Sequence, residues 1–152
     1  MSSKDQEFPA HVFLHFAPVQ IRFNDIDIMG HVNNSVFQHY FDYARLQYFR
    51  HVLGRHLTWE KETLILASIC VDYHCPVHIN DRIEVATGTV MVGNKSIHMV
   101  QEVRETESGN IMASSRCVLV AFDAASNCSI PLPGEWRQSV ISFEKEIRLK
   151  YG

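Results

Sequence analysis

A single long apolar helix is the feature that most constrains the fold of this chain. The segment from about Ser35 to Leu53 places apolar side chains at helical spacing, over a stripe that covers roughly 160° of a helical wheel. The stripe consists of Val36, Phe37, Tyr40, Phe41, Ala44, Tyr48 and Val52. Gly54 is a typical C-terminal stop for such a helix. Because the stripe is so wide, a second layer must cover the helix.

The rest of the chain is strand-like and is divided by turns. Alternating apolar and polar side chains predict a half-buried strand from Val19 to Asn24, ahead of the helix. Four further strands, connected as an antiparallel meander, are expected after it. They are expected at 64–78, 82–92, 95–105 and 111–123, with turns at Asn80-Asp81, Gly93-Asn94 and 108–110.

This order of elements predicts an α+β fold, with one curved antiparallel sheet wrapped around the helix. A length of 152 residues fits a single domain with an ordinary core. We therefore expect one domain over residues 1–152, in which 1–9 form a loose N-terminal arm. A short C-terminal helix with one apolar edge is expected within 133–147.

Composition excludes several classes of function. With 14 basic and 17 acidic side chains, the chain has no electrostatic footprint for nucleic acid. It also has no apolar run long enough for a membrane span, and its polar N-terminus lacks the apolar region of a signal peptide. The four cysteines form no close pairs, which predicts reduced, mostly buried thiols in a cytoplasmic protein and no metal site. These cysteines are Cys70, Cys75, Cys117 and Cys128.

The chemistry is concentrated in residues 22–34, just ahead of the apolar helix. This stretch holds two carboxylates, a histidine, a glycine and two asparagines. A helix start presents unpaired backbone N–H groups and the positive end of the macrodipole, which can stabilise a carbonyl oxygen as it gains negative charge. A carboxylate slightly upstream can attack that carbonyl or activate water against it. The segment therefore predicts acyl chemistry, with thioester hydrolysis as the leading hypothesis.

Two segments carry a family resemblance. The pattern Asp25-x-Asp27-x-x-Gly30-His31-Val32-Asn33-Asn34, followed by Tyr40-Phe41-x-x-Ala44-Arg45, resembles the hotdog-fold thioesterases of the 4-hydroxybenzoyl-CoA thioesterase type. Its His-Val-Asn-Asn form also resembles the motif of acyl-ACP thioesterases. A second segment, residues 71–81, is similar to the family's strand that ends in an aromatic residue, a proline and a turn aspartate.

The resemblance implies a hotdog homodimer or homotetramer with active sites between subunits. It implies an acyl-CoA or acyl-ACP substrate, and neither a metal nor another cofactor. Asp27 matches the catalytic carboxylate, Asn34 the position whose backbone N–H polarises the thioester carbonyl, and His31 the histidine near the carboxylate. The remaining residues expected at the substrate site are Gly30, Val32, Asn33 and Phe37.

Ile28-Met29-Gly30 departs from both patterns. The acyl-ACP type carries an asparagine where this chain has Met29, and the 4-hydroxybenzoyl type carries a Pro-Ala-Gly-like stretch. An aryl substrate is therefore not predicted, and Asp27 stays open as nucleophile or general base. Asp25 is interpreted as structural, holding the loop through backbone hydrogen bonds. Two alternative functions are an acyl-ACP thioesterase and a non-catalytic hotdog protein that binds acyl thioesters or serves in assembly.

Overall fold

The computed structural model describes residues 10–54, 61–145 and 147–149. The N-terminal arm expected at 1–9 lies outside these residues. Two short 3-10 turns, Phe23–Asp25 and Asn34–Val36, precede the long helix. The strands are β1 (His15–Val19), β2 (Glu62–Tyr73), β3 (Ile83–Val92), β4 (Ser96–Glu105), β5 (Ile111–Asp123), β6 (Cys128–Ser129) and β7 (Arg148–Leu149), and the helices are α1 (Phe37–Leu53) and α2 (Gly134–Phe143).

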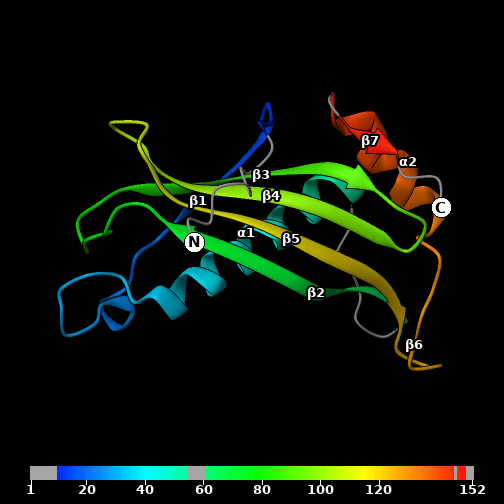
Figure 1. Cartoon of the computed structure of the whole chain (residues 1–152), viewed down its shortest axis with the longest axis horizontal. Coiled ribbons are helices and arrows are strands. Elements are labelled where there is room, and N and C mark those ends of the chain that lie inside the picture. Colours follow the sequence, from blue (N-terminus) through cyan, green and yellow to red (C-terminus); the bar gives the residue numbers. More distant parts are fainter. Residues whose placement is uncertain (1–9, 55–60, 146, 150–152) are drawn as a thin grey trace, which may run out of the picture.

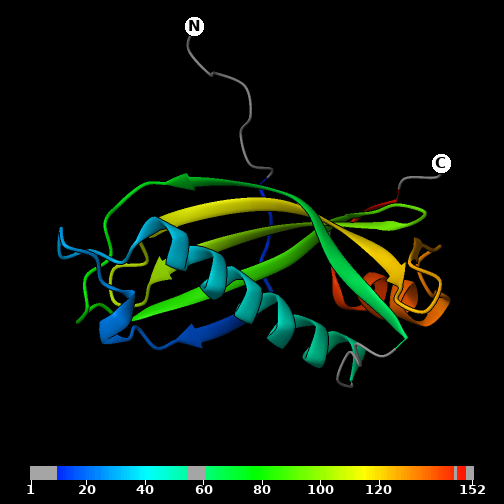
Figure 2. The same cartoon turned by 90° about the horizontal axis from the view of Figure 1, so that it is seen from below.

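The main sheet has the strand order β1-β3-β4-β5-β2, and each neighbouring pair in it is antiparallel (Figure 1). It is long and curved, and α1 lies along one of its faces (Figure 2). The short strands β6 and β7 extend it, β6 beside β5 and β7 parallel to β3. A curved antiparallel sheet around one long helix confirms the predicted hotdog fold.

The buried face of α1 confirms the predicted apolar stripe. Phe41, Ala44 and Tyr48 are completely buried between the helix and the sheet. Val36 and Val52, at the two ends of the stripe, are only partly buried. The helix ends where predicted, because Gly54 adopts the left-handed conformation with φ of 68°.

The predicted meander is wrong for one strand. β2 pairs with β5 at one edge of the sheet, whereas β3 lies between β1 and β4. The strand predicted at 64–78 ends at Tyr73, because the next two residues leave the ladder. The backbone N–H groups of His74 and Cys75 both donate to the carbonyl of Met112, at 2.8 and 3.1 Å. The chain then crosses the end of the sheet instead of turning back directly.

The first strand and the last helix also differ from the prediction. The strand predicted from Val19 to Asn24 is wrong: β1 ends at Val19, and residues 23–25 form a 3-10 turn. The side chain of Asp25 causes this turn by accepting a hydrogen bond from the backbone N–H of Arg22 at 2.9 Å. At the other end of the chain, α2 stops at Phe143, because Glu144 is extended with ψ of 137°.

The hairpins after β3 and β4 are confirmed, and in the first of them the N–H of Gly93 donates to the carbonyl of Ser96 at 2.8 Å. The expectation of mostly buried cysteines is wrong: Cys117 is buried, and the other three are exposed. All four are free thiols. Across the described part of the chain, neither helix is long and apolar enough to cross a membrane.

A buried carboxylate closes the end of the molecule where α1 finishes. Oε1 of Glu144 accepts hydrogen bonds from the hydroxyl of Tyr48 at 2.7 Å and from the backbone N–H of Thr89 at 2.8 Å. Its Oε2 lies 3.1 Å from Nε2 of His11, which brings the N-terminal segment against the residue that follows α2. His11 fills the space above Gly88, where a Cβ would lie 2.2 Å from the imidazole. We call Glu144, His11, Tyr48 and Thr89 the Glu144 cluster.

Candidate active site

The Asp27 loop closes on itself ahead of α1. The N–H of Asp27 donates to the carbonyl of His31 at 2.9 Å, and the N–H of Gly30 donates to the carbonyl of Asp27 at 3.0 Å. Within this turn, Oδ1 of Asp27 accepts from the N–H groups of Met29 at 2.9 Å and His31 at 3.4 Å. For the other oxygen, Oδ2, no hydrogen bond to a described residue is found. The loop thus orients the carboxylate through one oxygen and leaves the second available.

Gly30 is needed for the shape of this loop. Its φ is 82°, in the left-handed region that other residues rarely adopt. A Cβ at Gly30 would meet no atom within 4 Å, and Gly30 does not line the pocket described below. Its backbone conformation therefore accounts for the glycine, and close approach to a substrate stays a prediction.

Asp25 has the structural role that the sequence indicates. It is buried, and its Oδ2 accepts hydrogen bonds from the N–H of Arg22 and, at 2.7 Å, from the hydroxyl of Tyr40 on α1. Burial, followed by the hydrogen bond to Asp25, raises the pKa of the Tyr40 phenol above its usual value. The phenol therefore remains protonated and keeps the loop attached to the helix.

Asn33 and Asn34 occupy the start of the helical segment. The side chain of Asn33 caps it by accepting from the backbone N–H of Ser35 at 2.9 Å and from its hydroxyl at 2.8 Å. The carbonyl of Asn34 accepts a hydrogen bond from the hydroxyl of Tyr73 at 3.0 Å. The backbone N–H of Asn34 has no hydrogen-bond partner among the described residues, which leaves it available to a ligand.

The chain that follows β2 forms the opposite wall. The N–H of Val32 donates to the carbonyl of Val77 at 2.8 Å and joins this wall to the Asp27 loop. The two walls border an open pocket of about 290 Å³. Its lining consists of Asp27, Met29, His31, Val32, Asn34, Phe37 and residues 73–77. Five of the seven predicted site residues therefore meet here, whereas Gly30 and Asn33 support the walls from outside the lining.

The ring of His31 does not hydrogen-bond to Asp27. It packs edge-to-face against the ring of His78, with centroids 4.9 Å apart, and only the backbone N–H of His31 reaches the carboxylate. Across the pocket, burial raises the pKa of the Tyr73 phenol. Within residues 10–54, 61–145 and 147–149, no three His, Cys, Asp or Glu side chains gather closely enough to hold a metal ion.

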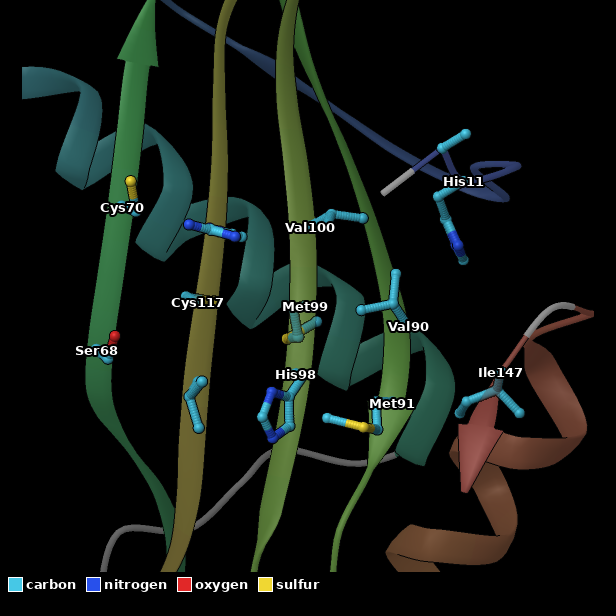
Figure 3. A pocket seen from close by; sticks show the side chains of 13 residues that line it. His11, Ser68, Cys70, Val90, Met91, His98, Met99, Val100, Cys117 and Ile147 are labelled. Carbon is cyan, nitrogen blue, oxygen red and sulfur yellow. The ribbon is translucent and has the colours of Figure 1, made fainter. Parts of the chain in front are cut away.

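A larger hollow, of about 770 Å³, lies on the face of the sheet away from α1 (Figure 3). Val90, Met91 and His98 rise from the strands toward the viewer, and His11 and Ile147 flank them. None of the predicted site residues lines this hollow, and its lining contains no carboxylate. We therefore place the candidate active site in the smaller pocket, where the carboxylate and the helix start meet.

Sequence reasoning did not place the second wall at the site. Tyr73, His74, Cys75 and Val77 lie about 40 residues after the Asp27 loop, and they reach it only because β2 ends beside the start of α1. The available signal was the similarity of residues 71–81 to the family's second motif, which carried no residue roles.

Comparison with known proteins identifies the family. The sequence pattern of the thioesterase-like superfamily matches residues 21–141, which include both walls of the pocket. The chain belongs to this superfamily. This agrees with the resemblance carried by the Asp27 loop and by residues 71–81.

Individual relatives support the assignment. A thioesterase from Thermus thermophilus, solved in complex with coenzyme A and Zn, is 31% identical, covers 87% of this chain and 95% of its own, and superposes with a TM-score of 0.76. The PA5185 protein from Pseudomonas aeruginosa is 27% identical over 88% of this chain and 94% of its own, with a TM-score of 0.80. The uncharacterized protein YsmA from Bacillus subtilis is 25% identical over 130 residues, 85% of this chain and 86% of that protein.

Proposed function

We propose that this member of the superfamily hydrolyses acyl-CoA thioesters to a free acid and coenzyme A, with Asp27 as nucleophile or general base. One observation carries the proposal: the Asp27 carboxylate is held through a single oxygen, beside the start of a helix and in an open pocket. Membership of a thioesterase-like superfamily supports the same chemistry.

Both routes use the available oxygen of Asp27. As nucleophile, it adds to the thioester carbonyl and expels the thiolate, leaving a mixed anhydride that water then hydrolyses. As general base, it takes a proton from a water molecule that attacks the carbonyl directly, and the thiolate leaves with a proton. The N–H bonds from Met29 and His31 orient the carboxylate for either route.

The developing oxyanion needs donors that are already in place. The backbone N–H of Asn34 meets this need, because it lies at the helix start. The Tyr73 hydroxyl donates a hydrogen bond to the carbonyl of the same residue and so holds Asn34 in place. The ring of His31, which lines the same pocket, supplies a second polar group. Phe37 and Val32 provide an apolar surface for the first carbons of an acyl chain.

We further propose that the chain works as a homodimer or homotetramer in the cytoplasm. β2 is twelve residues long and ends the sheet, with no described strand on its outer side. Unpaired edges of this length favour pairing with another strand. Close to the site, Phe23, Ile28 and Met29 are highly exposed, and Ile28 is as accessible as in an extended chain. Light scattering at micromolar concentration should give two or four times the mass of one chain, and a monomer would contradict the proposal.

The test is the release of free coenzyme A from a panel of acyl-CoAs, from short to long and including aromatic ones. Wild type is compared with Asp27→Asn and with Asp123→Asn, an aspartate outside the pocket lining, at the end of β5 away from the pocket. Release is followed by chromatography, because exposed thiols of the protein would react with a thiol dye. Turnover by wild type and Asp123→Asn, lost in Asp27→Asn, is the expected result.

Other outcomes separate the alternatives. Turnover that Asp27→Asn leaves unchanged would contradict the catalytic role of Asp27. No turnover of any acyl-CoA, followed by hydrolysis of acyl-ACP, would indicate the carrier protein instead. Binding of both without turnover would indicate a non-catalytic protein. A chelator should leave the rate unchanged. In a single turnover in water labelled with heavy oxygen, label in Asp27 would establish the nucleophilic route with water attacking the Asp27 carbonyl of the anhydride, because attack at the acyl carbon labels the released acid on either route.

A further inference from the structure

His78 lies behind the candidate site without lining it. Its ring meets the ring of His31 edge-to-face, at 85° and with centroids 4.9 Å apart. Aromatic rings prefer this geometry, because the positive edge of one faces the electron-rich face of the other. His31 lines the pocket and His78 does not, so His78 reaches the site only through His31.

Asp81 holds His78 in this position. Its Oδ2 accepts a hydrogen bond from the backbone N–H of His78 at 2.8 Å and lies 3.6 Å from Nδ1 of the same residue. The N–H of Asp81 donates in turn to the carbonyl of His78 at 3.1 Å. The turn therefore fixes the backbone of His78 and places the Asp81 carboxylate on the Nδ1 side of its ring.

The two loops are tied together in the core beside this contact. The neighbours of the two histidines, Val32 and Val77, share a backbone hydrogen bond of 2.8 Å and are both buried. The histidine rings therefore start from backbone positions that the core determines. Their side chains reach solvent, and that of His78 is 55% exposed, so the core does not restrain the rings themselves.

We propose that His78, oriented by Asp81, is a positioning residue that holds the ring of His31 at the candidate site. An imidazole has several rotamers, and catalysis needs one of them held to within a fraction of an ångström. The other polar groups of the pocket do not restrain it: Asp27 bonds to the backbone of His31, and Nε2 of His74 is bonded to Ser114 Oγ at 2.8 Å. Tyr73 bonds to Asn34, and Cys75 lies in the opposite wall.

The inference rests on the proposed function for its catalytic consequence, but it has a readout that needs no turnover. The ring C–H signals of His31, assigned by their loss in His31→Gln, are compared in wild type, His78→Ala, His78→Phe and Asp81→Asn. His78→Ala should shift them and should average the Hα–Hβ couplings of His31, because several rotamers interconvert rapidly once the neighbouring ring is gone. His78→Phe, which keeps an aromatic edge, should restore couplings close to those of wild type. Asp81→Asn should average the couplings partly, and His39→Ala, an exposed change on α1, should have no effect.

The steady-state activity of the same variants is measured next. We expect His78→Ala to lower kcat about tenfold with little change in KM, and His78→Phe to recover most of the loss. Unchanged His31 signals in His78→Ala, or a His78→Phe variant as impaired as His78→Ala, would overturn the inference. If Asp27→Asn retains full activity, the proposed function fails, and the spectra still decide whether His78 positions His31.

Discussion

Two carboxylates near opposite ends of α1 are held in contrasting ways. Glu144 has a side chain with no exposed surface, and both its oxygens are engaged, by Tyr48 and Thr89 on one side and His11 on the other. Asp27 is partly exposed and is held only through Oδ1, by N–H groups of its own loop. A carboxylate whose oxygens are all engaged stabilises the fold, whereas one with a free oxygen in a pocket remains available for chemistry.

Inside the Asp27 loop, burial rather than the number of engaged oxygens separates two carboxylates. Asp25 is two residues away, but it is buried and bonded to Tyr40 of α1 and to the backbone of Arg22. The two aspartates of this short loop therefore have different positions and contacts: Asp25 attaches the loop to the helix, and Asp27 faces the pocket. Local sequence composition is the same for both, and the position of α1 makes the difference.

The strongest test of the contrast is Asp27→Asn. We expect kcat/KM to fall by roughly 10²–10⁴-fold, because an amide is neither a general base nor an effective nucleophile. Asparagine still accepts hydrogen bonds from Met29 and His31, so the free energy of unfolding should change by less than about 0.5 kcal/mol. Enzyme kinetics and urea unfolding on the same preparation check both parts. A loss of stability large enough to explain the loss of activity would remove the contrast.

Glu144→Ala should show the reverse pattern. It leaves the Tyr48 hydroxyl, the Thr89 N–H and His11 without their acceptor in a buried place, which should cost about 3 kcal/mol of unfolding free energy. At temperatures where the variant is folded, its kcat should equal that of wild type. Glu144→Gln, which keeps one acceptor oxygen, is the matched control and should lose less. Reduced kcat in fully folded Glu144→Ala would show that the two ends of α1 are coupled.

A smaller effect is expected for Tyr40→Phe. The change removes only the hydroxyl that donates to Asp25, while the backbone N–H of Arg22 still donates to the same oxygen. Urea unfolding should show a loss of about 1 kcal/mol. An unchanged stability would mean that the Asp27 loop is held to α1 by its backbone contacts alone.

The smallest expected effect is a pH dependence of stability near the Glu144 cluster, at the end of the molecule where α1 finishes. Burial, and secondly the neighbouring His51, lower the pKa of His15 below its usual value of 6.5. The unfolded chain therefore binds this proton more readily, so the stability associated with neutral His15 is complete above 6.5 and decreases as the pH falls below it. Urea unfolding at about pH 7.5 and about pH 5.5 should show a smaller decrease in His15→Phe than in wild type. Equal decreases would contradict this assignment.

Predictions from the sequence were accurate where the cause is local. The apolar stripe of α1, the stop at Gly54, the hairpin at Gly93 and the structural role of Asp25 each depend on residues close together in the chain. Five of the seven predicted site residues meet in one pocket, because the loop and the helix start that carry them are contiguous. Their roles remain proposals that the variants above test.

The errors share a different cause. A local pattern could not show that β2 joins β5, since a hairpin to β3 has an equally good alternation of side chains. Nor could it show the wall at 73–77, or a His78 ring beside His31, because the crossing of the sheet end brings these segments together. The hydrogen bonds of Glu144 could not be predicted either, since its partner His11 is 133 residues away.

The sequence by itself therefore determined the helix, most of the strands and the position of the Asp27 loop ahead of the helix, because side-chain periodicity, capping and turn residues act over a few neighbours. Only the tertiary structure decided which strand lies at the edge, what forms the second wall of the pocket and which carboxylate is closed off. Those outcomes depend on how the apolar face of α1 is buried by the whole sheet. Burial is a property of residues distant in the chain and close in space.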